Sequence, residues 1–216
     1  MIIKDLRKRI LTSLILLFLI FLIIKFNFIL VYSLIVLGVV SCLEFFNIIK
    51  KIFNNKYYLL TYNLLFIIYV FIFSLLFFFF SNILQLKIIL FTLLFGCIAS
   101  DIGGFIFGKI FKGPKLTKIS PNKTISGSLG SFIFSCITIA LIFYYYTENT
   151  NINILIIGLI TSLFCQLGDL FFSFLKRKAK IKDTGNFLPG HGGALDRVDG
   201  IFLGIPFGFM ALAILY

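Results

Sequence analysis

Long apolar runs, interrupted by short polar segments, follow one another along almost the whole chain. A helix needs about 20 mainly apolar residues to cross a bilayer, and several runs approach or exceed that length. They cover residues 10–24, 28–42, 58–80, 87–107, 128–146, 153–175 and 200–216. The first two are short, so one bent or re-entrant hairpin is an alternative for them. The pattern predicts an all-α, polytopic integral membrane bundle of about seven transmembrane helices, within a range of six to eight.

The composition supports the same fold class. Hydrophobic residues make up 60% of the 216 residues and charged residues 13%, whereas soluble domains are roughly 25% charged. We divide the chain into an N-terminal membrane hairpin with basic segments (1–57) and a C-terminal helical membrane domain (58–216). The basic flank before the first run is not followed by a small-residue cleavage site, which favours a retained span over a signal peptide. The four cysteines lie singly in apolar runs, as buried packing residues do.

The Lys and Arg residues are distributed asymmetrically between alternate loops. If the N-terminus is cytoplasmic, 18 of the 20 fall on the cytoplasmic side, and only Lys25 and Lys87 lie outside. Cytoplasmic loops carry such an excess in multi-pass membrane proteins. The asymmetry predicts that two polar loops, 108–127 and 176–199, share the cytoplasmic face. It also accounts for the net charge of +12, and because no nucleic-acid-binding motif accompanies the cations, we expect no nucleic-acid partner.

Acidic residues are scarce, and two of the eight, Asp101 and Asp169, lie inside or at the ends of apolar runs. An ionised Asp at the centre of a membrane helix costs about 2.5–3.5 kcal/mol on insertion scales, so it is retained mainly where it faces a cavity, a cation or a partner. On a helix, Asp169 would share a face with Ser173 and Lys176. The small residues in 99–108 predict a close contact between helices.

The most polar stretch runs from Ser173 to Asp199. Its Lys and Arg side chains can hold phosphate oxygens. Asp196 and Asp199, three residues apart, can share one side of a helical turn and bind a hard divalent cation. Glycines in the same stretch, including Gly192 and Gly193, would let the backbone approach a ligand closely. Together these features predict a site for a metal-bound polyphosphate.

A second polar segment, Lys112 to Ser131, leads into a helix start that is rich in small residues. Backbone N–H groups at such a start, with Lys123 beside them, would suit a phosphate. The chain contains neither the P-loop pattern nor GxGxxG, which argues against a soluble-type nucleotide fold.

Both polar segments resemble those of one enzyme family, phosphatidate cytidylyltransferase, also called CDP-diacylglycerol synthase. The C-terminal stretch is similar to the family signature at Ser173, Lys176, Arg177, Lys182, Asp183, Pro189, His191, Gly192, Gly193, Asp196, Arg197 and Asp199. The segment SPNKTISGSLGS (120–131) resembles the family's SPKKTxEGxxGG. It departs from the family at Ser126, where Glu is usual, and at Ser131, where Gly is usual; Gly200 stands where Ser or Ala is common. The resemblance covers the C-terminal half, and the first hundred residues match only in hydropathy.

The resemblance implies transfer of CMP from CTP to phosphatidate, giving CDP-diacylglycerol and pyrophosphate in phospholipid biosynthesis at the cell (inner) membrane. It implies Mg²⁺, with a second metal ion left open, and metal ligands at Asp169, Asp196 and Asp199; Asp101 is a further candidate. The expected catalytic residues are Lys176, Arg177, Lys182, Asp183, His191 and Arg197. The expected substrate-binding residues are Ser120, Lys123, Thr124, Ser173, Gly192 and Gly193. CTP, phosphatidate and the lipid bilayer are the expected partners, and the family suggests a homodimer.

Three points stay open from the residues themselves. We favour a phosphate-donor or loop-shaping role for His191 over acid–base catalysis, because a phosphate-monoester nucleophile is already anionic. A cation- or proton-coupled transporter that uses Asp101 and Asp169 is one alternative function. A CTP-dependent lipid kinase, which transfers the γ-phosphate, is another. The concentration of charge in one loop favours the transferase over a transporter, whose polar groups would be spread through several spans.

Overall fold

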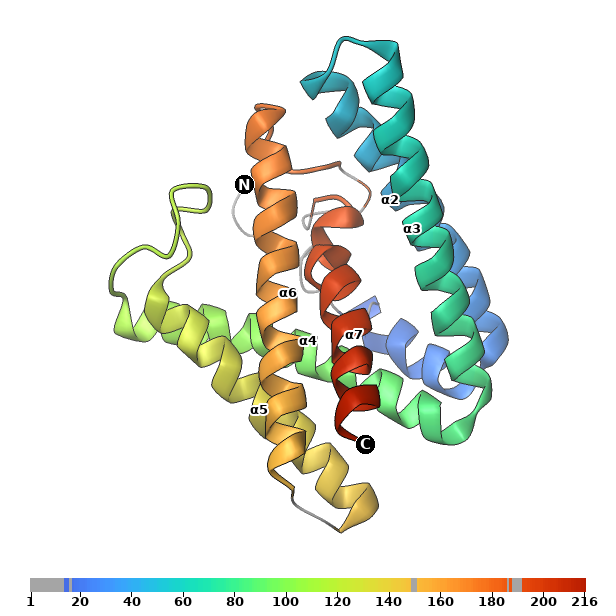
Figure 1. Ribbon diagram of the computed structural model, residues 1–216, viewed down its shortest axis with the longest axis vertical. Helices are drawn as coiled ribbons and strands as arrows, with labels where there is room; N and C mark the ends of the chain where they lie inside the picture. Colours follow the sequence, from blue (N-terminus) through green and yellow to red (C-terminus); the bar gives the residue numbers. More distant parts are fainter. Residues whose placement is uncertain (1–13, 16, 149–150, 186, 188–191) are drawn as a thin grey trace. The chain divides into compact units, whose positions relative to one another are not determined.

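The computed structural model describes residues 14–15, 17–148, 151–185, 187 and 192–216. Its long helices are α2 (Asn27–Ile52), α3 (Lys56–Asn82), α4 (Leu84–Phe111), α5 (Ile125–Thr147), α6 (Ile152–Lys178) and α7 (Leu195–Leu215) (Figure 1). All six are long and apolar enough to cross a membrane. An isolated β-bridge joins Lys115 and Thr124, and the structure has no named strand among the described residues. The prediction of an all-helical, multi-pass membrane protein is confirmed.

The helices extend beyond the apolar runs that predicted them. The run 28–42 corresponds to α2, which continues to Ile52, and α6 continues to Lys178. Helix α7 begins at Leu195, so the predicted loop 176–199 ends earlier than expected, and Asp196 and Asp199 lie in the first turns of a helix, as their spacing allowed. Hydropathy marks the apolar part of a helix, whereas backbone hydrogen bonds continue into polar residues at its ends. The run 10–24 lies partly outside the described residues; 14–15 and 17–25 are helical.

The chain divides into two compact units, which we describe separately. The first comprises Met1–Ile83 and Leu175–Val198, and the second comprises Leu84–Phe174 and Asp199–Tyr216. This division by packing does not test the expected functional boundary between 1–57 and 58–216, which stays a prediction.

In the first unit, α2 and α3 lie side by side along their lengths (Figure 1). Phe45 and Phe66 stack at the contact with ring centroids 3.9 Å apart. Asn55 ends the short connection between the two helices, and its side chain accepts a hydrogen bond from the N–H of Tyr57 at 3.0 Å, which caps α3. The polar segment that connects α6 with α7 belongs to the same unit.

In the second unit, α4 and α5 pack with their main chains in contact. A Cβ atom placed on Gly127 would lie 2.8 Å from the carbonyl oxygen of Gly104, and one on Gly130 would lie 2.7 Å from that of Gly103. The close contact expected from the small residues of 99–108 is therefore present. Helices α6 and α7 also approach closely, since a Cβ on Gly168 would lie 2.6 Å from the carbonyl oxygen of Asp199.

Candidate functional site

The segment between α4 and α5 folds as a narrow, hairpin-like loop. The N–H of Leu116 donates to the carbonyl of Lys123 at 2.8 Å, and the N–H of Ile125 donates to the carbonyl of Pro114 at 3.0 Å. At the far end, the N–H of Lys123 donates to the carbonyl of Ser120 at 3.1 Å. These bonds hold Lys123 on the arm of the loop that returns to α5.

The base of this loop is closed by two hydroxyl side chains. Thr124 is the N-cap of α5, and its Oγ1 accepts a hydrogen bond from the N–H of Gly127 at 3.1 Å. Ser126, one of the departures from the resembled family, donates through its Oγ to the carbonyl of Lys112 at 2.9 Å. Thr124, expected to bind substrate, thus has a defined structural role in starting the helix.

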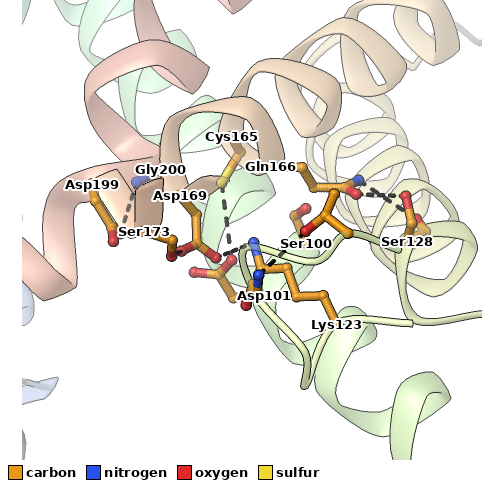
Figure 2. A network of polar contacts seen from close by, with 12 residues as sticks. Ser100, Asp101, Lys123, Ser128, Cys165, Gln166, Asp169, Ser173, Asp199 and Gly200 are labelled. Atoms are coloured by element: carbon orange, nitrogen blue, oxygen red, sulfur yellow. Dashed lines mark hydrogen bonds and ion pairs between the residues drawn. The ribbon is translucent and has the colours of Figure 1, made fainter. Parts of the chain in front are cut away.

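Lys123 and Asp169 form an ion pair that joins the loop to α6 (Figure 2). Ser173, one turn further along α6, donates through its Oγ to Oδ1 of Asp169 at 3.3 Å. The side chains of Lys123 and Asp169 are 27% and 30% exposed, so a ligand can reach both. We call Lys123, Asp169 and Ser173 the Lys123–Asp169 cluster. It unites residues from the two polar segments that the sequence had singled out separately.

Two further acids lie in this region of the second unit (Figure 2). Asp101 on α4 is exposed, and its Oδ1 lies 4.0 Å from the Sγ of Cys165 on α6. Asp199 is 9% exposed, and its Oδ1 accepts a hydrogen bond from the N–H of Gly200 at 2.9 Å. Acids from α4, α6 and α7 therefore border the same part of the unit.

Polar side chains also tie α4, α5 and α6 together beside the cluster. Ser100 and Ser162 hydrogen-bond to each other at 2.8 Å, and Gln166 donates to Ser162 at 3.2 Å. Ser128 donates to Oε1 of Gln166 at 2.6 Å (Figure 2). Hydrogen bonds between buried groups fix helix register, so these contacts hold the start of α5, and the loop that precedes it, against α6.

Asp196 is the centre of a second polar cluster, in the first unit. Its Oδ1 accepts from Nζ of Lys176 at 2.7 Å. Its Oδ2 accepts from the N–H of Thr184 at 2.8 Å, from Oγ1 of Thr184 at 3.0 Å, and from the N–H of Gly193 at 3.1 Å. Only 8% of the Asp196 side chain is exposed. We call these residues the Asp196 cluster.

The sequence reasoning missed Glu44, which contacts the same loop. Glu44 lies on α2, is 6% exposed, and accepts hydrogen bonds from Thr184, Ala194 and Leu195. Counting only Asp101 and Asp169 as acids of apolar spans was wrong, because the predicted span ended at 42 and α2 continues to Ile52. The available signal was a single acid in the apolar segment SCLEFFN.

The other expected site residues fall into three groups. The side chains of Arg177, Lys182 and Arg197 are exposed, as cationic phosphate-binding groups at a surface would be, and the side chain of Asp183 is exposed as well. Ser120 and Gly192 are partly exposed. Pro189, Gly190 and His191 lie outside the described residues.

The carboxylates differ in how well they suit a Mg²⁺ ion. Among the described residues, no group of three or more His, Cys, Asp and Glu side chains is placed to hold a metal. Mg²⁺ is commonly bound by one or two carboxylates, with substrate phosphates and water completing six oxygen ligands. Asp169 and the Ser173 hydroxyl are hard, accessible oxygens and fit that donor set. Asp196 already accepts four hydrogen bonds, which fits an anchor within the protein better than an open ligand.

Two departures from the resembled family have local packing explanations. A Cβ on Gly200 would lie 2.7 Å from the Sγ of Cys165 and 3.0 Å from its carbonyl oxygen, so Cys165 fills the space that a larger residue would need. Ser131 packs against α4 at Gly104, since a Cβ atom placed on Gly104 would lie 2.6 Å from the Oγ of Ser131.

Comparison with known proteins gives a family and several relatives. The family model described as the cytidylyltransferase family matches residues 4–215. The phosphatidate cytidylyltransferase of Rickettsia typhi is 44% identical in a match of 127 residues that covers 54% of this chain and 56% of the relative. That of Staphylococcus aureus (strain COL) is 46% identical over 109 residues, 50% of this chain and 42% of the relative. That of Rickettsia bellii is 43% identical over 127 residues, covering 54% and 55%. The chain thus spans about half the length of the curated relatives it matches.

Proposed function

The chain belongs to the cytidylyltransferase family, and on that premise we propose that it transfers CMP from CTP to phosphatidate, forming CDP-diacylglycerol and releasing pyrophosphate. The relatives named phosphatidate cytidylyltransferase support the choice of lipid substrate. Neither the family nor these relatives favours a transporter or a lipid kinase.

The ion pair between Lys123 and Asp169 is the observation that carries the proposal. It brings the cation of the polar loop before α5 and the acid of the apolar part of α6 to one accessible place, beside Ser173. A reaction between two polyanions needs that combination: cations to neutralise phosphate oxygens, and a carboxylate to retain a divalent metal.

The chemistry is an in-line substitution at phosphorus. A phosphate oxygen of phosphatidate attacks the α-phosphorus of CTP, and the bond from that phosphorus to the bridging oxygen of the β-phosphate breaks. Pyrophosphate leaves with the bonding electrons. The nucleophile is anionic from the start, so positioning and charge neutralisation carry most of the catalysis, and no strong general base is needed.

We assign roles to this chain's residues on that basis. Lys123 donates to a phosphate oxygen of the bound substrates, and Asp169 with Ser173 holds Mg²⁺. When bound, Mg²⁺ supplies electrostatic stabilisation of phosphate oxygens. Arg177, Lys182 and Arg197, all exposed, contact the triphosphate or the phosphatidate headgroup. In the absence of substrate, the ion pair with Asp169 keeps the Lys123 ammonium at the site.

The lipid substrate sets the location. Phosphatidate keeps its acyl chains in the bilayer, so the enzyme must present its polar loops at the membrane surface. We propose the cell membrane, with both polar loops on the cytoplasmic side where CTP is available; the excess of Lys and Arg in those loops supports this orientation. A homodimer is part of the same proposal.

The direct test is a product assay on the purified protein with CTP, phosphatidate and Mg²⁺. We expect a cytidine-containing lipid and one pyrophosphate for each lipid converted. Release of CDP with a phosphorylated lipid would instead identify a lipid kinase, and the absence of both products would overturn the proposal.

A paired substitution ties the activity to the cluster. Lys123→Met should lower kcat/KM roughly a hundredfold or more, because it removes a charged donor from the transferring phosphates. Lys118→Met, at an exposed lysine of the same loop, is the matched control and should stay within about twofold of the parent. Equal effects of the two substitutions would remove Lys123 from the site.

A further inference from the structure

The first backbone N–H groups of α7 need a partner, and Glu44 provides it. A helix leaves the N–H groups of its first turn without intrahelical acceptors, and a polar N-cap side chain usually accepts from one of them. The residue before α7 is Ala194, which has no such side chain. Instead, Oε1 of Glu44 accepts from the N–H of Ala194 at 3.0 Å, and Oε2 accepts from the N–H of Leu195 at 2.9 Å.

The charge of Glu44 suits this position. An anion at a helix N-terminus interacts favourably with the aligned peptide dipoles. Burial of a carboxylate is costly unless it is well hydrogen-bonded, and Glu44 has two backbone donors and the hydroxyl of Thr184 at 2.6 Å. The carboxylate therefore occupies the kind of place in which a bound phosphate would otherwise be stabilised.

Thr184 connects Glu44 to Asp196. Its Oγ1 lies 2.6 Å from Oε2 of Glu44 and 3.0 Å from Oδ2 of Asp196, and its N–H donates to the same Oδ2. The single hydroxyl group is shared between the two carboxylates. Both acids therefore hold Thr184 in place. A substitution of Glu44 would move Thr184, and Thr184 supplies two of the donors that Asp196 accepts from.

The loop has no room for side chains around Glu44. A Cβ on Gly185 would lie 2.6 Å from Oε1 of Glu44. A Cβ on Gly193 would overlap both Glu44 and Thr184. Gly193 was expected to let the backbone approach the substrate. In the structure, the absence of a side chain at Gly193 lets the loop pack against Glu44 on α2.

We propose that Glu44 is a positioning residue: it fixes Thr184 and residues 193–195 on α2, and through Asp196, which these residues hold, it sets the position of Lys176, an expected catalytic residue. The fixing of the loop is independent of the reaction, whereas its catalytic consequence rests on the proposed function. The backbone N–H groups at 184, 193, 194 and 195 all point to carboxylates. Substrate phosphates in this part of the protein must therefore be held by side chains, not by these amides.

The loop itself is tested by hydrogen exchange on the full-length protein in detergent. Glu44→Gln leaves a single acceptor and turns an NH₂ group toward the remaining donors. The amides of 184 and 193–195 should then exchange about tenfold faster or more, because a buried donor without a partner costs about 1–3 kcal/mol and 1.4 kcal/mol is a factor of ten. Exchange in α4 and α5 should not change.

The matched control is Ser41→Ala, one turn before Glu44 on the same helix. Ser41 is fully buried, and its Oγ has no hydrogen-bond partner among the described residues. This control removes a buried hydroxyl of α2 and leaves the Glu44 carboxylate with its donors, so exchange at 184 and 193–195 should match the parent. If Glu44→Gln does not yield folded protein, Thr184→Val tests the same contact from the other side, with Thr184→Ser as its conservative partner.

Kinetic measurements on the same variants distinguish a positioning role of Glu44 from a loss of the fold. Glu44→Gln and Thr184→Val should each lower kcat with a smaller change in KM for CTP, and Thr184→Ser should restore most of the rate. The double variant should lose little more than the poorer single variant, because both act through one contact. Unchanged exchange at 184 and 193–195 in Glu44→Gln, or fully additive losses, would overturn the proposal. A parent protein without transferase activity would overturn the proposed function alone, since the exchange result would still decide the role of Glu44 in the loop.

Discussion

Asp169 and Asp196 carry the same chemical group in different surroundings. Asp169 is partly exposed and is bound by one lysine and one hydroxyl. Asp196 is nearly enclosed and receives four hydrogen bonds, three of them from the loop itself. Substitution of Asp196 would therefore disturb the loop as well as any bound metal, and Asp169 is the cleaner position at which to test metal binding.

We predict that Asp169→Asn abolishes formation of the cytidine lipid at every Mg²⁺ concentration, because the amide removes the negative charge that retains the cation. Asp169→Glu keeps the charge on a longer side chain and should recover part of the activity with Mn²⁺, whose coordination geometry is less demanding. The measurement is product formation across Mg²⁺ and Mn²⁺ titrations. An Asn variant with the parent's rate and metal dependence would show that Asp169 is structural.

Residue chemistry and spacing singled out Lys123, beside a helix start, and Asp169, an acid in an apolar run, and the structure brings these two side chains together. Their roles in the reaction stay predictions. Glu44 and Thr184 could not be linked from sequence, since 140 residues separate them and only the packing of α2 against the loop brings them together. The use of the Gly193 N–H by Asp196 is equally a property of the folded loop.

At the scale of helices, the contact between α4 and α5 determines where the loop 112–124, which carries Lys123, begins and ends. Gly103 and Gly104 on α4 face Gly127 and Gly130 on α5. The two main chains are so close that a Cβ atom placed on Gly127 or Gly130 would lie within 2.8 Å of a carbonyl oxygen of α4. A sequence can predict such a contact from small residues at helical spacing, but the partner helix has to be found in the structure. The ends of the helices were also poorly predicted, because polar residues continue α2 and begin α7.

Gly103→Ala should destabilise the protein by about 1–3 kcal/mol, because its Cβ would overlap the main chain of Gly130 and cannot be accommodated by a rotamer change. Gly38→Ala on α2 is the control: its Cβ would meet the Cγ1 of Val70 at 3.3 Å, a side-chain contact that can adjust. Thermal unfolding in detergent measures both. Equal loss of stability in the two variants would contradict the main-chain contact between α4 and α5.

At the scale of the whole protein, hydropathy was sufficient to predict an all-helical membrane fold, because every backbone group inside a bilayer must be hydrogen-bonded within the protein. The order of the helices also constrains topology. Two membrane-spanning helices, α5 and α6, separate the loop 112–124 from the polar segment after α6. An even number of crossings returns the chain to the same side of the membrane.

We therefore expect single cysteines at Lys118 and Lys182 to react with a membrane-impermeant maleimide from the same, cytoplasmic side. A cysteine at Glu148, exposed at the end of α5, should react from the opposite side. Labelling is compared in intact cells and in inverted vesicles, with the four native cysteines replaced by alanine. Reaction at Lys118 and Lys182 from opposite sides would exclude a common surface for the two polar segments.

The contact of Glu44 with the loop has a consequence for biosynthesis. Helix α2 is made and inserted well before Thr184, Ala194 and Leu195 leave the ribosome. At about 5–20 residues per second, the intervening 140 residues take roughly 7–30 s to translate. During that interval the carboxylate has none of its final donors and must be hydrated by water or paired with other groups. A segment synthesised much later thus completes the environment of Glu44, and α2 reaches its final surroundings only after the start of α7 has been made.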